Sequence, residues 1–389
     1  MNNQAARKTK NNVKKGRLYL AFELSLASWK LGFSDGECTR ARIRTIKAQD
    51  FEALGEEIRT SKKHFELAQT AAVVSCYEAG REGFWLDRVL RERGIENVVV
   101  DAASIDVERR KRPKTDRLDA EVLVRNLVRY GRGERDVWSV VRVPSREAED
   151  RRHLHREIGT LQGEQQRHRS RIQSFLFGHG VVVNVTARLM RDFATLRCWE
   201  GQPLPAELSA RIEREYARLQ LVEQQLKQLR QQQAARLKEG QTPGAEKIRL
   251  LQKLCGIAMT SSWVFVMEFF GWRQFANRRE LAGALGLTPM PYQSGSRSHE
   301  QGISHAGNRR VRTMAIEIAW SWLRYQPRSA LSQWYQQRFG SGGKRLRRIG
   351  IVAMARRLMI DLWRYMEQGI LPPGAVLKKA PDAQALVAE

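Results

Sequence analysis

Three short apolar runs follow one another near the start of the chain, and they constrain the fold more than any other feature. The runs cover residues 18–24, 28–33 and 39–46. Turn-forming residues at 34–37 separate the second run from the third, a spacing typical of a β-hairpin. The sequence therefore predicts that the chain opens with three neighbouring strands.

The segments after this meander alternate between helix and strand. Helices are predicted at residues 50–65, 83–93 and 115–130, with buried strands at 71–77 and 97–102 between them. A doubly wound nucleotide-binding domain would alternate from its first strand and carry a GxGxxG motif after it. Neither feature is present, and the order β-β-β-α-β-α-β-α predicts an RNase H-like (RuvC-like) domain over residues 18–140.

The remaining chain is predicted to be helical, so the fold class is α/β plus α. Apolar residues three and four apart within 154–175 and 208–237 indicate two long helices with narrow seams. We expect residues 141–243 to form a long coiled-coil hairpin that mediates self-association and carries no chemistry. Residues 244–371 are predicted to form a mainly helical domain. The basic arm 1–17 and the tail 372–389 are expected to be disordered.

A formal net charge of +26 indicates a polyanionic partner. Nucleic acid is the usual one, and an anionic membrane surface is the rival. No segment approaches the roughly 20 consecutive apolar residues that a membrane span needs. The four cysteines are far apart and show no CxxC pairing, which argues against a structural zinc site and against a disulfide framework. We therefore expect a cytoplasmic protein with reduced thiols.

Acidic residues stand where an RNase H-like sheet places a metal site. Glu23 lies on the first strand, Glu78 directly follows the fourth, and Asp116 and Asp119 share one face of the third helix. Converging carboxylates can hold Mg²⁺ or Mn²⁺ for phosphodiester chemistry. Each residue also has a plain interpretation: Glu23 as a solvated side chain, Glu78 as a turn residue and Asp116 as a helix cap. The neighbouring cations expected to hold phosphates are Arg112, Lys114 and Arg117.

A long polar loop is predicted over residues 287–307 and contains Ser294 followed by Gly295. Loops of this length inside a domain are usually functional, and glycine lets a phosphate approach the backbone. A serine hydroxyl needs activation to act as a nucleophile, and no GxSxG elbow is present. A plain glycine–serine turn therefore stays open as an alternative. The cations expected to pair with phosphates are Arg297, Arg309, Arg310 and Arg312.

Several short motifs in both halves resemble one family when taken together. They are SCYEAG at 75–80, VVVD at 98–101, KTDRLDA at 114–120, LGLTP at 285–289, QSG at 293–295, GIS at 302–304 and GNRRVR at 307–312. In this combination the chain resembles the DEDD transposases of insertion sequences, a family that includes the Piv-type DNA invertases.

The resemblance covers nearly the whole chain and implies a mechanism. It implies a RuvC-like domain, a C-terminal transposase domain with Ser294 as nucleophile, and a covalent phosphoserine intermediate. It also implies a guide (bridge) RNA, encoded by the element, that selects the DNA. Glu23 stands where the family has aspartate, and residues 24–27 lack the family's usual lysine.

Three functions are compatible with these features. The first is a recombinase that cuts and rejoins DNA as a dimer or tetramer. The second is an RNase H-like nuclease that resolves Holliday junctions, which needs the carboxylates but not Ser294. The third is a non-catalytic nucleic-acid-binding protein in which Glu23 marks decay. A covalent protein–DNA adduct would separate the first from the other two.

Overall fold

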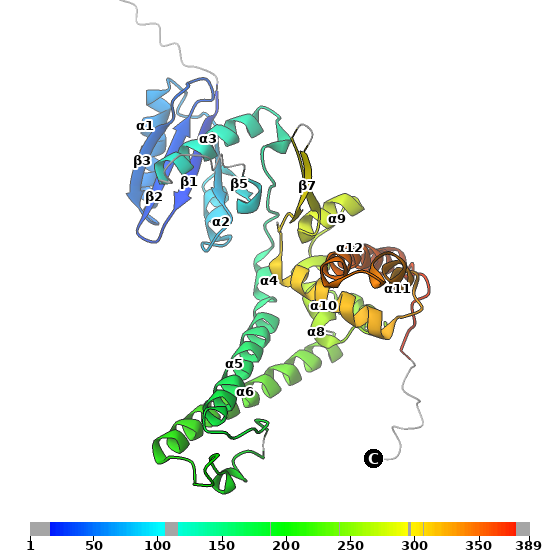
Figure 1. Cartoon of the computed structure of the whole chain (residues 1–389). Helices are drawn as coiled ribbons and strands as arrows, with labels where there is room; N and C mark the ends of the chain where they lie inside the picture. The colour runs from blue at the N-terminus through cyan, green and yellow to red at the C-terminus, as the bar shows by residue number, and fades with distance from the viewer. Residues whose placement is uncertain are drawn as a thin grey trace, which may run out of the picture. The chain divides into compact units, whose positions relative to one another are not determined.

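A computed structural model (Figure 1) describes residues 16–105, 116–186, 188–240, 242–294, 297–305 and 307–378 of the chain. Their contacts divide into two compact units. One comprises Met1–Pro144 with Ser304–Gly307, and the other comprises Ser145–Ile303 with Asn308–Glu389. The predictions for residues 1–15 and 379–389 fall outside the described residues. No described helix is long and apolar enough to cross a membrane.

The first unit is built on a five-stranded mixed sheet, with strand order β3-β2-β1-β4-β5. Its strands are β1 (Leu18–Leu24), β2 (Ser28–Ser34), β3 (Arg42–Lys47), β4 (Val73–Glu78) and β5 (Glu96–Val100). The first three pair antiparallel, whereas β4 and β5 extend the sheet in parallel from β1. The predicted order of strands and helices is confirmed.

Alternation of side chains along the strands gives this sheet two covered faces. Leu20, Phe22 and Tyr77 belong to a core with α1 (Phe51–His64) and α2 (Trp85–Glu92). The residues between them point to the opposite face, as the two-residue period of a strand requires. There, a second core joins the sheet to α3 (Asp116–Gly131). The sheet is therefore the middle layer of three.

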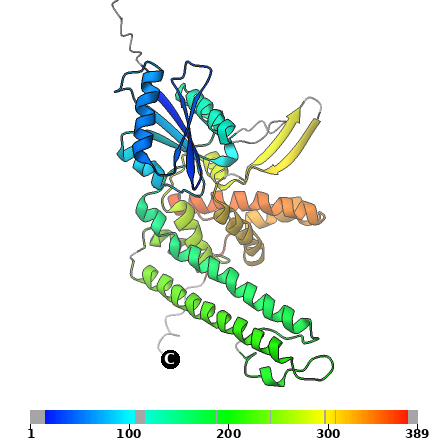
Figure 2. The same cartoon turned by 90° about the vertical axis from the view of Figure 1, so that its left-hand side faces the viewer.

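Two long helices dominate the start of the second unit, after the short helix α4 (Arg146–Asp150). They are α5 (His153–Phe177) and α6 (Ala206–Lys238), and Figure 2 shows them lying along one another. Leu161, Val222 and Leu226 belong to one core, and Ile172 and Leu219 to another further along the pair. The two predicted helices are thus present and packed together.

Polar pairs interrupt the apolar seam between α5 and α6. The carboxylate of Glu215 is buried on α6, and its Oε1 lies 2.7 Å from Nδ1 of His168 on α5. Arg171 donates to the same oxygen at 2.8 Å, and Arg218 donates to Oε2 at 2.9 Å. A buried carboxylate destabilises the fold unless its oxygens are paired. This cluster therefore favours the register of α5 and α6 that brings the three donors to Glu215.

The rest of the second unit is a helical core with one β-hairpin. Its helices are α7 (Ala245–Gln252), α8 (Met259–Phe265), the π-helix Val266–Phe270, α9 (Arg278–Leu285), α10 (Arg309–Tyr325), α11 (Ala330–Tyr335), the π-helix Gln336–Gly340 and α12 (Lys344–Gln368). Trp263, Trp322 and Leu358 lie in the shared core. Residues 372–378 differ from the expected disorder, because Val376 and Lys378 make backbone hydrogen bonds to Cys255 and Lys253.

The prediction of a loop over residues 287–307 is wrong for most of this segment. The strands β6 (Pro289–Ser294) and β7 (Arg297–Ile303) form an antiparallel hairpin. Two prolines hide the first strand in the sequence, because proline cannot donate to a neighbouring strand. A two-stranded hairpin tolerates them, and its register shifts between Pro289 and Pro291.

We expect Glu215→Gln to weaken the α5–α6 pair. Burial works to raise the pKa of Glu215, but hydrogen bonds from Arg171, His168 and Arg218 outweigh it and lower the pKa to about 2. A carboxyl whose pKa falls on folding stabilises the folded state above its unfolded pKa, and the contribution is lost as pH falls through the folded value. The variant should lose about 1–3 kcal/mol in urea unfolding at pH 7.

The same difference should shrink between pH 4 and pH 2, and hydrogen exchange should locate the loss in α5 and α6. The matched control is Glu213→Gln, which changes an exposed carboxylate of the same helix. Equal losses in the two variants would show that the buried cluster adds no stability.

Candidate active site

Glu23 and Glu78 occupy neighbouring positions at one end of the sheet. Glu23 is the penultimate residue of β1, and Glu78 is the last residue of β4. The parallel register pairs Phe22 with Tyr77, so the two glutamates follow one step further along adjacent strands. Adjacent strands lie about 4.8 Å apart. Phe22 and Tyr77 face α1 and α2, and alternation therefore places both glutamates on the face that α3 covers.

The helix α3 runs along this face in the direction opposite to β1. Near its C-terminus, a Cβ added to Gly131 would lie 2.8 Å from the hydroxyl oxygen of Tyr19, at the start of β1. Near its N-terminus, a Cβ added to Gly32 would lie 2.9 Å from the carbonyl oxygen of Ala120. Gly32 is the register partner of Ala21, further along β1. The first turn of α3 therefore lies toward the end of the sheet that carries Glu23.

Asp116 opens α3, and Asp119 lies one turn before the buried Leu123 on the same side of the helix. The backbone thus places Glu23 and Glu78 on the face that α3 covers, with the N-terminal end of α3 directed toward the same end of the sheet. Glu23 and Asp119 are half-buried and Glu78 is exposed. The side chain of Asp116 lies outside the described part. Among the described side chains, which include Glu23, Glu78 and Asp119 but not Asp116, no group of three or more histidine, cysteine or acidic residues could hold a metal ion.

The donor set at this end is suited to a hard divalent cation. Carboxylate oxygens are the ligands that Mg²⁺ and Mn²⁺ prefer, and no sulfur or imidazole is among the four predicted positions. Of the predicted phosphate-binding cations nearby, Arg112 and Lys114 lie outside the described residues. Arg117 is exposed, and its Nε donates to Glu121 at 3.2 Å. Such an exposed pair is weak, so a phosphate can take over Arg117 at little cost.

The hairpin places Ser294 next to its turn. Ser294 is the last residue of β6 and is the register partner of Arg297, the first residue of β7. The sequence placed this serine in a loop, and the structure places it at a strand end.

The cations after the hairpin differ in exposure. Arg309 and Arg310 are exposed in the first turn of α10. Arg312 is buried, and its Nη1 donates to the carbonyl oxygen of Leu285 at the end of α9. Arg312 therefore joins α10 to α9, a structural contact that its sequence position did not indicate. Arg309 and Arg310 remain as the exposed cations of this turn.

The sequence analysis missed Glu268, a buried carboxylate that contacts α5 and the residue before α10. Glu268 lies in the π-helix Val266–Phe270 and is 0% exposed. Its Oε1 lies 2.9 Å from Nε2 of His155, and Arg156 donates to its two oxygens at 2.7 and 2.9 Å. Asn308 donates from Nδ2 to Oε2 at 2.9 Å. The signal in the sequence was a single carboxylate within the apolar run 263–270.

Asn308 links this carboxylate to the start of α10. Its Oδ1 accepts hydrogen bonds from the backbone amides of Arg310 and Val311, which caps the helix. Burial works to raise the pKa of Glu268, but hydrogen bonds from His155, Arg156 and Asn308 and the charge of Arg156 hold it well below its usual range. Glu268 is therefore ionised at neutral pH and joins α5, the π-helix and α10.

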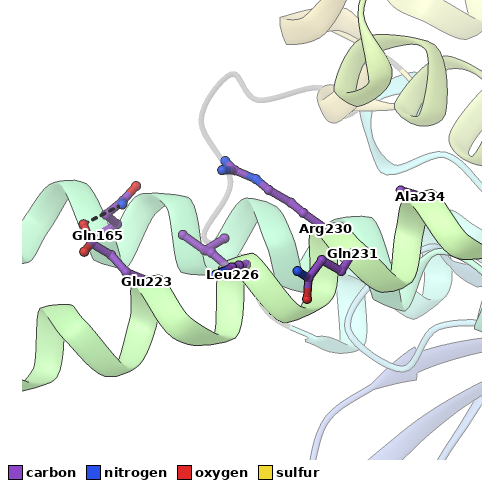
Figure 3. Close-up of a pocket in the computed structure, with 7 residues that line it drawn as sticks. Gln165, Glu223, Leu226, Arg230, Gln231 and Ala234 are labelled. Atoms are coloured by element: carbon purple, nitrogen blue, oxygen red, sulfur yellow. Dashed lines mark hydrogen bonds between the residues drawn. The ribbon is translucent and has the colours of Figure 1, made fainter. Parts of the chain in front are cut away.

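A shallow groove along α5 and α6 lies apart from these residues (Figure 3). Its lining residues are Gln165, Glu223, Leu226, Lys227, Arg230, Gln231 and Ala234. Gln165 donates to Glu223 across the helix pair at 3.0 Å. None of the predicted site residues lines this groove, and we assign it no chemistry.

Comparisons with known proteins connect these features to one group. Residues 248–336, which include Glu268, Ser294 and Asn308, match the model of the family described as Transposase IS116/IS110/IS902. A Sinorhizobium fredii protein named as a transposase, y4rJ, is 39% identical over 93% of this chain and 95% of its own length. A second one from the same organism, y4qE, is 29% identical over 74% of this chain and 67% of its own length. A Pseudomonas aeruginosa protein named as a family 20 transposase is 27% identical over 80% of this chain and 88% of its own length.

We expect Glu268→Gln to lower the free energy of unfolding by about 3–5 kcal/mol, because the change removes the counter-ion of the buried Arg152 and the half-buried Arg156. The measurement is denaturant unfolding of the full chain at pH 7. The control is Glu367→Gln, which removes a more exposed ion pair with Lys247 and should cost less than about 1 kcal/mol. Similar losses in the two variants would contradict a special role for Glu268.

Proposed function

Because this chain belongs to the IS116/IS110/IS902 family of transposases, we propose that it cuts and rejoins the DNA of a mobile element with Ser294 as nucleophile. The observation that carries the proposal is the placement of Glu23, Glu78 and the first turn of α3 at one end of a sheet face. The strand order of this sheet supports an RNase H-like interpretation of the first unit. Ser294 at the end of β6 supports a separate nucleophile.

Each acidic residue would contribute an oxygen to a divalent cation. Glu23, Glu78, Asp116 and Asp119 would hold Mg²⁺ or Mn²⁺, which when bound stabilises negative charge on phosphodiester oxygens. Glu23 in place of aspartate is longer by one methylene but keeps its carboxylate. The four carboxylates on the α3 side of the sheet would repel one another unless a cation is bound between them.

The serine step would keep the energy of the broken phosphodiester bond in a covalent bond between serine and DNA. Attack by Oγ of Ser294 forms an O–P bond while one P–O bond of the backbone breaks. The serine hydroxyl gives up its proton, and the freed deoxyribose oxygen takes up a proton and leaves as a hydroxyl. Attack by the hydroxyl of a second strand reverses these changes, which restores the serine and joins new ends without an external energy source.

The partners follow from the exposed cations. Arg117, Arg309 and Arg310 are exposed and would pair with phosphates, and Arg297 would do so from the hairpin. The net charge of +26 suits DNA and a guide RNA together. We further propose that α5 and α6, as a coiled-coil hairpin, mediate self-association into a dimer or tetramer.

Ser294→Ala should abolish the covalent protein–DNA adduct while DNA binding stays unchanged, because only the nucleophile is lost. The measurement is a denaturing gel of reactions with DNA that spans the ends of the element, alongside a binding assay. Ser296→Ala and Ser298→Ala are the controls and should keep the adduct. An adduct in Ser294→Ala that disappears in Ser296→Ala would move the nucleophile to Ser296.

Asp119→Asn should lower strand cleavage at least about 100-fold at fixed Mg²⁺, because an amide oxygen is a weaker ligand than a carboxylate. Nucleic-acid binding should persist. The control is Glu121→Gln, which changes a carboxylate of the same helix that pairs with Arg117. Loss of cleavage in Asp119→Asn combined with full activity in every serine variant would favour a metal-dependent nuclease over a recombinase.

A further inference from the structure

Lys30 is a cation built into the acidic end of the sheet. It lies on β2, and the antiparallel register makes it the Cα partner of Glu23 on β1. Directly paired residues of antiparallel strands project to the same face, with Cβ atoms about 4.5–5.5 Å apart. Lys30 and Glu23 are both half-buried. The ammonium group of Lys30 is therefore within reach of the carboxylate that would bind the metal.

The surroundings of Lys30 on this face are defined by its neighbours along β2. Trp29 and Leu31 belong to the opposite core, so Lys30 and Gly32 face α3. Gly32 lies under the carbonyl of Ala120, and the turn of α3 that contains Asp119 comes just before it. Lys30 thus shares the face with three acidic residues, Glu23, Glu78 and Asp119.

A lysine and a divalent cation that share the same carboxylates compete for their negative charge. An ammonium beside a carboxylate lowers its affinity for a second cation, because the two positive charges repel. A lysine has a flexible four-carbon stem, and its ammonium binds phosphate oxygens as readily as carboxylates. A nucleic-acid phosphate at this end of the sheet can therefore draw Lys30 away from Glu23.

We infer that Lys30 couples metal binding to nucleic-acid binding. Without nucleic acid, Lys30 neutralises part of the acidic site and holds its metal affinity low. When a phosphate takes over the ammonium, the carboxylates are released and the metal binds tightly. This inference rests on the metal site of the proposed function. By linkage, the metal strengthens nucleic-acid binding by the same factor.

The test measures Mn²⁺ binding to the full chain by the electron paramagnetic resonance of free Mn²⁺, with and without a short DNA duplex. Binding to the duplex alone is subtracted. Without DNA, Lys30→Met should bind Mn²⁺ about tenfold more tightly than the unchanged protein. DNA should tighten Mn²⁺ binding in the unchanged protein and have little effect in Lys30→Met. Asp119→Asn marks the site and should remove this binding in both backgrounds.

Two further variants complete the design. Lys47→Met removes an exposed lysine at the end of β3 in the same sheet and should behave like the unchanged protein. Lys30→Arg keeps the charge and should keep the low affinity. Equal Mn²⁺ affinities in Lys30→Met and the unchanged protein would overturn the coupling while the metal site stands. Absence of Asp119-dependent binding in every variant would overturn the metal site and the coupling with it.

Discussion

The carboxylate of Glu268 has no exposure to solvent, and the arrangement of the second unit depends on how its charge is satisfied. An unpaired buried carboxylate would cost several kcal/mol, so folding must bring its donors together. Those donors come from α5 and from Asn308, which are 113 and 40 residues away from it along the chain. The Glu268 carboxylate thus holds the N-terminal end of α5 against the start of α10.

This constraint extends to the hairpin that carries Ser294. Asn308 caps α10 five residues after β7 ends, and Arg312 in the next turn binds the carbonyl of Leu285 before β6 begins. The start of β6 therefore follows a helix end that a buried polar contact holds. Under the proposed function, Ser294 must be held near its reacting position, and a strand end provides this better than a free loop.

The parts of the structure that the sequence predicted are those fixed by local patterns. The apolar runs of β1 and β4 are visible in the sequence, and they place Glu23 and Glu78 at strand ends without knowledge of their neighbours. Pairing between distant segments leaves no such pattern. The contact of Glu268 with Asn308 could not be read from either residue, and burial of Arg312 depends on where α9 ends. Prolines concealed β6, because the rule against proline in strands applies to central strands more than to hairpins.

The register of Glu23 and Lys30 shows why the same sequence can look both functional and decayed. A glutamate in place of aspartate with no lysine in the following residues suggests a weakened site when the strand is considered alone. In the sheet, Lys30 on the neighbouring strand β2 is the register partner of Glu23. A lysine therefore lies beside Glu23, although it does not follow Glu23 directly in the sequence. Under the proposed mechanism, a chain with a charge of +26 repels itself until phosphates neutralise it. Under the same proposal, the nucleic acid that draws Lys30 away from Glu23 would also complete the metal site that acts on that nucleic acid.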